Sequence, residues 1–96
     1  MVSYGPVSTG KSRPLSSSQI RAARGLLRWS AIDLAREASL GLATIKRAES
    51  AADETSMTAA NDLAVRRALE AAGVEFIEEN GGGPGVRLRE RAQRKS

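Results

Sequence analysis

Residues 29–49 constrain the fold of this chain more than any other stretch. They contain two short segments whose apolar residues recur at helical spacing, joined by a short turn. Ser30 is placed to cap a first helix, and a break at Ser39-Leu40-Gly41 separates that helix from a second one. Two helices that cross steeply over so short a turn need a small residue where they touch, and Ala35 meets that need. The apolar residues of the two segments are Ile32, Leu34, Ala35, Ala38, Ala43, Ile45 and Ala48. The pattern predicts a helix-turn-helix, with Leu40 filling the turn.

A further helix is expected on each side of this pair. Ser16 and Gln19 have the spacing of a capping box, which predicts that a helix begins at Ser16. Its expected buried stripe is Ile20, Ala23, Leu26 and Leu27. Trp29, between the first two helices, is interpreted as a core anchor rather than a binding residue. Thr58 caps the last helix, which ends at Gly73. The residues expected on its buried side are Ala60, Leu63, Ala64, Ala68, Leu69 and Ala72, with Arg66 and Arg67 exposed.

A β-hairpin is predicted to follow the helices. The runs 74–77 and 86–89 flank the segment Gly81-Gly82-Gly83-Pro84-Gly85. This segment lacks the Lys-Ser/Thr pair and the helix of a phosphate-binding loop, so a turn is the better interpretation. A two-stranded hairpin is marginal alone, so it must pack on the helices or pair with a second copy of the chain. The fold class is therefore mainly α, with four helices and a short C-terminal hairpin over residues 15–89, a flexible N-terminal arm over 1–14 and a basic tail over 90–96.

The composition excludes several kinds of chemistry. The 96 residues suffice for one domain and include neither Cys nor His. Disulfides, thiolate metal sites and the commonest general base are thus absent, and we expect neither an enzyme nor a cofactor. Asp53 and Glu54 are two adjacent carboxylates without further ligands, which do not make a metal site. The chain shows no apolar run long enough to span a membrane and no signal-peptide pattern, so we expect a cytoplasmic protein.

Positive charge is concentrated near the ends of the chain. The stretch from Val86 to Ser96 holds five basic residues against one acidic residue, a net charge of +4. The stretch from Gln19 to Gly85 holds eight basic against ten acidic residues, a net charge of −2. A surface that attracts nucleic acid must therefore come from local clustering or from the arm and the tail.

The motifs W-S-x-x-x-L-A and L-x-x-x-T-I-K-R-x-E, at residues 29–35 and 40–49, resemble the helix-turn-helix of lambda-repressor-like, or XRE-family, transcriptional regulators. The C-terminal stretch A-L-E-A-A-G-V-E-F-I-E-E-N-G-G-G-P-G-V-R-L-R extends the resemblance to a compact bacterial subgroup, over residues 15–89. The resemblance implies a regulator, favoured as a repressor, that binds a palindromic operator in double-stranded DNA as a homodimer.

In such a regulator the second helix of the motif would lie in the major groove. Lys46 and Arg47 are the side chains best suited to reach bases. Leu42 or Ala43 could touch a thymine methyl group, and Thr44 could donate to a phosphate at the start of the helix. The alternative for Lys46 and Arg47 is an ordinary solvated helix face.

Several residues depart from the family pattern. Members usually carry Gln at the position of Ala31, Gly at Ser39 and a Ser or Thr cap at Gly41, and polar residues at Leu42 and Ala43. These departures leave an alternative function, in which the helix-turn-helix scaffold binds a protein partner, as an antitoxin or an antagonist of another regulator would. An apolar helix face suits a protein surface better than a DNA surface. Salt dependence separates the two, because phosphate contacts weaken steeply as ionic strength rises.

Overall fold

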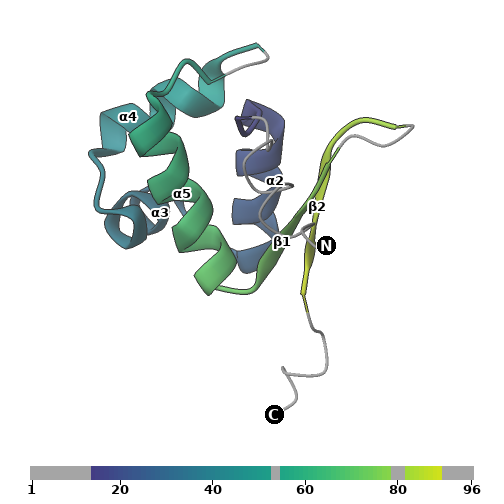
Figure 1. Ribbon diagram of the computed structural model, residues 1–96. Helices are drawn as coiled ribbons and strands as arrows, with labels where there is room; N and C mark the ends of the chain where they lie inside the picture. The colour runs from purple at the N-terminus through teal and green to yellow at the C-terminus, as the bar shows by residue number, and fades with distance from the viewer. Residues whose placement is uncertain (1–13, 53–54, 79–81, 90–96) are drawn as a thin grey trace, which may run out of the picture.

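Four helices and one hairpin make up the described part of the chain. The computed structural model describes residues 14–52, 55–78 and 82–89 (Figure 1). The elements in chain order are α2 (Ser17–Leu27), α3 (Ala31–Ala38), α4 (Leu42–Ser50), α5 (Ala59–Ala71), β1 (Val74–Ile77) and β2 (Gly85–Leu88). The mainly helical prediction with a C-terminal hairpin is confirmed. The predictions for residues 1–13 of the arm, for the tail over 90–96, and for Asp53 and Glu54 fall outside the described residues.

Local capping signals fix where the helices begin. The Ser16 hydroxyl accepts from the backbone N–H of Gln19 at 3.1 Å, and the Gln19 side chain accepts from the N–H of Ser16 at 3.0 Å. Ser30 and Asp33 form the same reciprocal pair at the start of α3. The hydroxyl of Thr58 accepts from the N–H of Asn61 at the start of α5. All three caps were predicted, because a cap needs only residues within one helical turn.

One apolar core lies between the four helices and the hairpin. Its fully buried residues are Leu15, Ile20, Ala23, Leu34, Ala35, Ala38, Ile45, Ala48, Val65, Leu69 and Val74. Trp29 and Leu40 are half-buried and pack against this core, as the sequence predicted for the anchor and the turn. Leu15 was not predicted. It precedes α2, and its N–H donates to a carboxylate oxygen of Asp62 on α5 at 3.0 Å.

The structure corrects three expected burial patterns. Leu26 on α2 is 40% exposed and Ile32 on α3 is 52% exposed, so neither lies in the core. On α5 the buried pair is Val65 and Leu69, whereas Leu63 is 44% exposed and Ala60 is also exposed. An Ala-rich helix has several apolar stripes, and burial of the larger Val65 excludes more apolar area from water than burial of an alanine. Ala64 and Ala72 are half-buried, as is Ala68, which packs against the core.

Two further side chains differ from expectation. Arg66 was expected to be exposed but is half-buried, with its guanidinium 5.2 Å from the centroid of the Phe76 ring. That distance is typical of a cation–π contact. No close helix contact explains the glycine at position 25, since a Cβ built there would meet no atom of the described residues within 4 Å. Arg67 is exposed as predicted.

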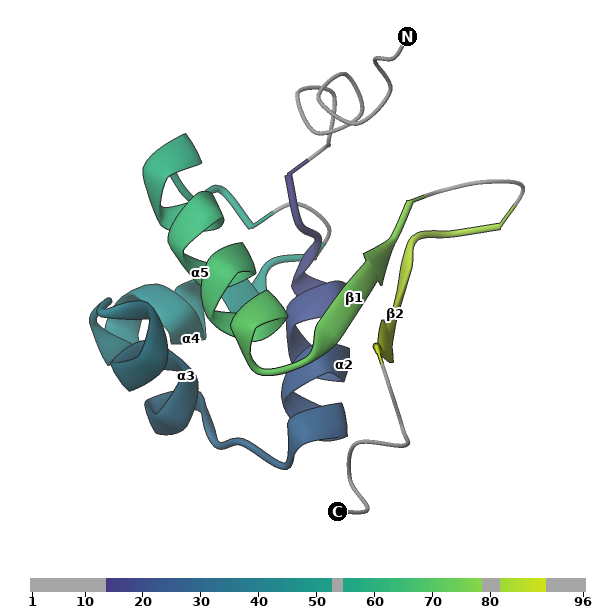
Figure 2. The same cartoon turned by 60° about the horizontal axis from the view of Figure 1, so that its bottom comes forward.

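The hairpin packs on α2 and α5. The strands β1 and β2 are antiparallel, with Val74 opposite Leu88 and Phe76 opposite Val86. β1 packs against α5 and α2, and β2 packs against α2. Gly73 follows Ala72, the C-cap of α5, and has a φ of 108°, a conformation that glycine adopts without a steric penalty. In Figures 1 and 2, α4 lies on one side of α2 and the hairpin on the other. No helix among the described residues is long and apolar enough to cross a lipid bilayer.

Candidate nucleic-acid interface

The turn between α3 and α4 is closed by backbone bonds. The N–H of Leu40 donates to the carbonyl of Ala35 at 2.9 Å, and the N–H of Ser39 donates to Arg36 at 3.2 Å. Ser39 has a φ of 58°, in the left-handed region that favours glycine. Ala35 is 5% exposed, so its small side chain lies inside the motif as predicted. This turn fixes the direction in which α4 leaves α3.

The outward face of α4 carries most of the residues predicted for it. Ala43, Lys46 and Arg47 are exposed, and Thr44 is half-buried. Leu42 differs from the prediction of a solvent-facing residue, because it is half-buried and packs against the core. The reason is its position three residues before Ile45, which is fully buried and brings that side of the helix inward. The accessible part of the face is therefore Ala43, Lys46 and Arg47.

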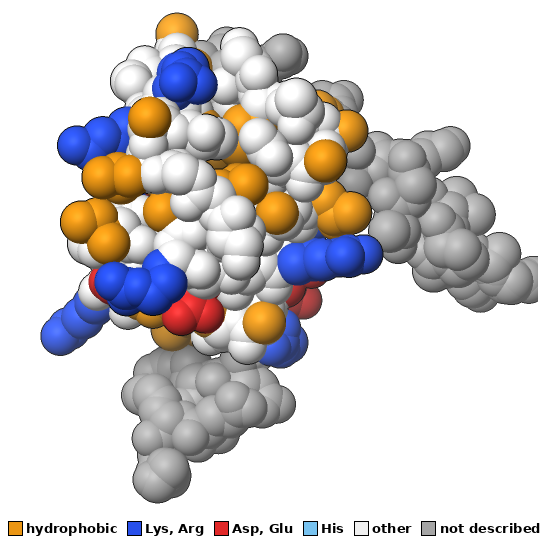
Figure 3. Space-filling model, turned by 90° about the vertical axis from the view of Figure 1, so that its left-hand side faces the viewer, with side chains coloured by type: hydrophobic (Ala, Val, Ile, Leu, Met, Phe, Trp, Pro, Cys, Tyr) orange, Lys and Arg blue, Asp and Glu red, His pale blue; other side chains and the backbone are white. Residues whose placement is uncertain are grey.

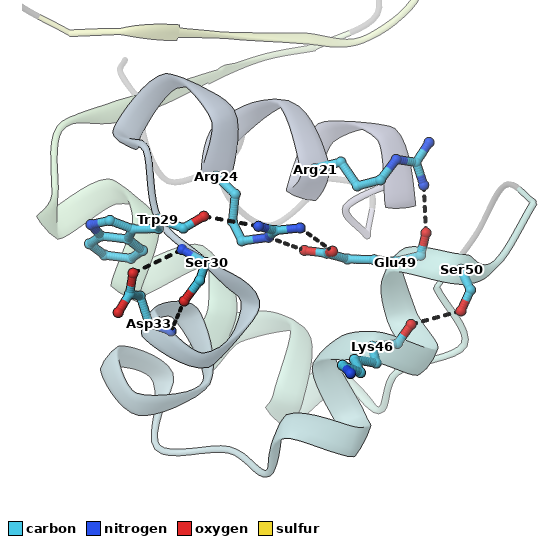
Figure 4. Close-up of polar contacts among 8 residues, drawn as sticks. All are labelled: Arg21, Arg24, Trp29, Ser30, Asp33, Lys46, Glu49 and Ser50. Atoms are coloured by element: carbon cyan, nitrogen blue, oxygen red, sulfur yellow. Dashed lines mark hydrogen bonds and ion pairs between the residues drawn. The ribbon is translucent and has the colours of Figure 1, made fainter.

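The two cations of α4 are available to an outside ligand. Within residues 14–52, 55–78 and 82–89, neither Lys46 nor Arg47 forms an ion pair or a side-chain hydrogen bond. The backbone carbonyl of Lys46 accepts from the Ser50 hydroxyl at 2.7 Å, which leaves its ammonium group uninvolved (Figure 4). In contrast, Arg24, Arg36 and Arg87 are paired with carboxylates.

The two helix starts in the motif differ in their capping. At the start of α3, the N–H of Asp33 donates to the Ser30 side chain and is therefore occupied. The Asp33 carboxylate also places a negative charge in the first turn. The hydrogen bond from the backbone of Ser30 holds the pKa of Asp33 below its usual value, so the negative charge persists there. At α4, Gly41 has no side chain to cap the helix, and the N–H groups of Leu42 and Ala43 have no acceptor among the described residues. Of the two starts, only that of α4 suits an anion.

A network of hydrogen bonds holds the end of α4 against α2. Arg24 donates from Nε and Nη2 to the two carboxylate oxygens of Glu49, each at 2.7 Å (Figure 4). Its third nitrogen, Nη1, donates to the backbone carbonyl of Trp29 at 2.9 Å. The hydrogen bonds to Glu49 raise the pKa of Arg24. Arg24 thus connects α4 both to α2 and to the link between α2 and α3.

Two backbone carbonyls near the end of α4 also accept from α2. Arg21 donates to the carbonyl of Glu49, and the Ser17 hydroxyl donates to the carbonyl of Ala51 at 2.8 Å. The sequence alone does not identify these partners. Arg21 and Arg24 lie 28 and 25 residues before Glu49 in the chain. The only local signal is that the last carbonyl groups of a helix have no donor within the helix and need one from elsewhere.

Apolar side chains separate the cations on the side of the molecule where α3 and α4 lie. Figure 3 shows Lys and Arg side chains spread around this face, with apolar side chains and backbone between them. The face is not one continuous basic patch. Any affinity of this face for DNA must therefore come from a few individual cations rather than from a broad positive field.

Comparison of the chain with protein-family models, with curated proteins and with solved structures gave no match. No group of three or more carboxylate, His or Cys side chains that would hold a metal ion occurs among the described residues. The exposed face of α4 is the candidate site that the sequence and the geometry both single out.

Proposed function

We propose that this protein is a sequence-specific, DNA-binding transcriptional regulator that places α4 in the major groove. The observation that carries the proposal is the contrast between the two faces of α4. Its inner face is fixed by Ile45, Ala48 and the Arg24–Glu49 pair, while its outer face offers two cations that no described residue pairs with. A rigidly held helix that presents free donors is what base recognition requires.

Each residue of the proposed interface has a role set by its chemistry. Arg47 reads a guanine through two parallel hydrogen bonds, and Lys46 contacts a second acceptor or a phosphate. Ala43, at the exposed start of the helix, packs against a thymine methyl group. Thr44 and the free N–H groups after Gly41 hold a phosphate at the start of α4. Leu42 contributes only the part of its side chain that the core leaves uncovered.

The proposed regulator acts as a homodimer and, in the favoured form, as a repressor. A single helix of nine residues reads only a few base pairs, and two copies on a palindromic operator double the contacts. The half-sites would lie about 34–36 Å apart, one turn of B-DNA, or a multiple of that distance. Occupancy of a promoter by such a dimer blocks polymerase. Neither catalysis nor a cofactor has a part in this proposal.

The decisive experiment is selection of purified protein on random DNA duplexes at two salt concentrations. The expected result is enrichment of a pseudo-palindrome, with affinity that falls on the order of a thousandfold between 50 and 200 mM salt if several phosphates are contacted. Sedimentation of the protein with the selected duplex gives the number of bound copies. Weak binding that is indifferent to sequence would reject the proposal.

A second function is favoured by the apolar character of the same face. Ala43 is exposed and Leu42 is half-exposed, and apolar side chains lie between the cations in Figure 3. The scaffold would then bind a protein partner, as an antitoxin or an antagonist of another regulator does. That complex would show a weak salt dependence, and substitution of Ala43 by Glu would disrupt it more than substitution of Lys46 by Ala.

A further inference from the structure

The outer edge of β2 has backbone groups that no other strand of the described residues satisfies. The N–H of Arg89 donates to the carbonyl of Gly73 at 2.7 Å, and these two residues lie opposite each other when the register is extended by one pair. Hydrogen-bonded and non-hydrogen-bonded pairs alternate along an antiparallel ladder. The N–H and C=O groups of Val86 and Leu88 therefore point away from β1. In the described part of the chain, β2 has β1 as its only neighbouring strand.

Exposed apolar side chains of α2 lie beside this open edge of β2. The side-chain amide of Gln19 donates to the carbonyl of Gly85 at 3.2 Å, so β2 begins over the first turns of α2. From there β2 packs against α2 and runs in the same direction as that helix (Figure 2). Leu26 lies two turns after Gln19 on the same stripe of α2, and Leu88 lies three residues after Gly85, a rise of about 10 Å in each element. Leu26, which is 40% exposed, thus lies near the Leu88 end of β2.

The exposed Ala22 adds to this apolar surface of α2 on the side away from β1. It precedes Leu26 by one turn of α2 and is turned further from the core than Gln19. Because β1 packs on both α5 and α2 whereas β2 packs on α2, the surface of α2 that remains uncovered lies on the outer side of β2. A strand added there would cover Ala22 and Leu26.

The solvent face of β2 is basic. Val86 and Leu88 pack towards the core, so the alternating residues Arg87 and Arg89 project from the opposite face, where both are exposed. Arg87 Nε lies 2.8 Å from a carboxylate oxygen of Glu75 on β1. Arg89 donates to the backbone carbonyl of Glu70 at 3.1 Å and interacts electrostatically with Glu75, so this one carboxylate on β1 serves two cations on the solvent face of β2.

The pairing of β1 with β2 shows which side chains in a neighbouring strand complement those of β2. Val74 and Phe76 of β1 lie opposite Leu88 and Val86 on the core side of the sheet. Glu75 lies opposite Arg87 on the solvent side. A neighbour on the other edge of β2 would meet the same alternation of apolar and basic side chains.

We propose that the open edge of β2 binds an extended segment of a partner protein in which apolar and acidic residues alternate. Its backbone completes the hydrogen bonds of Val86 and Leu88, as in other cases of strand addition. Its apolar side chains cover Ala22 and Leu26, and its carboxylates lie beside Arg87 and Arg89. Because α4 lies on the other side of α2, this surface functions independently of the proposed DNA interface.

A second copy of the chain fits this edge poorly. Consider two antiparallel β2 strands related by a two-fold axis. If the axis passes through Arg87, the two Arg87 residues lie opposite each other. If it passes through Leu88, Arg87 of each copy lies opposite Arg89 of the other. Like charges directly opposite each other destabilise a sheet. An axis at Val86 instead sets Leu88 against Pro84, which has no N–H to donate. An acidic partner strand meets neither obstacle.

The test is a titration of the full chain into a fluorescently labelled peptide of alternating Val and Glu, followed by anisotropy. Two peptides serve as comparisons, one with Lys in place of Glu and one with Ser in place of Val. The Val-Glu peptide is expected to bind at least tenfold more tightly than either. Equal or absent binding of all three peptides would overturn the proposal.

Two protein variants locate the binding edge. The double variant Glu75→Arg with Arg87→Glu keeps the cross-strand pair but reverses the charge at position 87, which leaves the solvent face of β2 neutral. It is expected to bind the Val-Glu peptide several-fold more weakly and the Val-Lys peptide more tightly. Val86→Pro removes an outward N–H without breaking a bond to β1, and a loss of about tenfold is expected. Arg67→Ala, on α5, removes a positive charge elsewhere and should leave binding unchanged.

Circular dichroism and sedimentation decide between the remaining explanations. Each variant should keep the helical spectrum of the parent chain. If the double variant folds and binds both peptides as the parent does, the edge is not the site. If the parent chain sediments as a dimer that Val86→Pro dissociates, the occupant is a second copy and the acidic-partner proposal is wrong.

Discussion

Arg24 and Glu49 face each other across the packing of α2 on α4 and share two hydrogen bonds of 2.7 Å. Their side chains are 24% and 10% exposed, so the pair is largely shielded from water. Because Arg24 also donates to the carbonyl of Trp29, one side chain ties together three parts of the fold. The position of α4, and with it the proposed DNA-binding face, depends on this pair.

Replacing Arg24 by Ala should destabilise the protein by about 2–3 kcal/mol. The substitution leaves the Glu49 carboxylate and the Trp29 carbonyl without their donors in a partly dry site. Urea denaturation, monitored by circular dichroism, measures the effect. The matched control is Arg87→Ala, which breaks the exposed pair with Glu75 and should cost less than about 1 kcal/mol. Equal losses for the two variants would show that the Arg24 pair has no special structural role.

Acid should weaken the fold partly through Asp33. The hydrogen bond from the Ser30 backbone lowers the pKa of Asp33 from 3.8, so the ionised carboxylate stabilises the folded state. This contribution is fully present above pH 3.8 and disappears as the pH falls through the lower pKa of the folded state. Urea denaturation at a series of pH values should show a smaller loss of stability below pH 4 for Asp33→Asn than for the parent chain. Parallel pH profiles for the two proteins would contradict the role of this cap.

The sequence predicted the elements that are determined locally. Ser16, Ser30, Thr58 and Gly73 mark helix ends through contacts within one turn, so their neighbours in sequence suffice to identify them. The hairpin was likewise predicted from alternation and a Gly-rich turn, and the structure shifts its second strand by one residue. Of the candidate site, Ala43, Lys46 and Arg47 proved exposed as expected.

Contacts between distant segments were beyond the sequence. The buried face of α5 was predicted only in part: Leu69 is buried as expected, but Val65 was missed and Leu63 is exposed. Alanines make several stripes of this helix apolar, and only packing selects Val65. Leu42 is half-buried because Ile45, three residues later, points into a core that distant segments build. The bond between Leu15 and Asp62 spans 47 residues and has no signature in either segment.

The corrected face of α5 gives a stability prediction. Leu69→Ala should destabilise the protein by about 2–5 kcal/mol, because Leu69 is fully buried and its removal leaves a cavity. Leu63→Ala should cost less than about 1 kcal/mol, since Leu63 is 44% exposed. Thermal unfolding of the two variants compares the same chemical change on two faces of one helix. A larger loss for Leu63 would show that Leu63, rather than Leu69, faces the core.

Ser39→Gly should stabilise the protein. Ser39 has a φ of 58°, and an L-residue in this region costs about 1 kcal/mol that glycine does not pay. Glycine also makes the unfolded chain more flexible, which offsets part of the gain, so a net increase of about 0.5 kcal/mol is expected. Gly41→Ala is a suitable control, since Gly41 has a φ of −73° and no strain to relieve. A loss of stability in Ser39→Gly would show that the Ser39 side chain contributes a contact of its own.

The final prediction tests the recognition helix directly. Arg47→Ala and Lys46→Ala should each weaken binding to the selected DNA duplex by about tenfold, because each removes an exposed donor that contacts a base or a phosphate. Helicity should not change, since neither side chain packs in the core or pairs with another described residue. Arg67→Ala removes the same charge from α5 and controls for the general loss of electrostatic attraction. If both α4 variants bind as the parent does, α4 is not the recognition helix, whatever the protein binds.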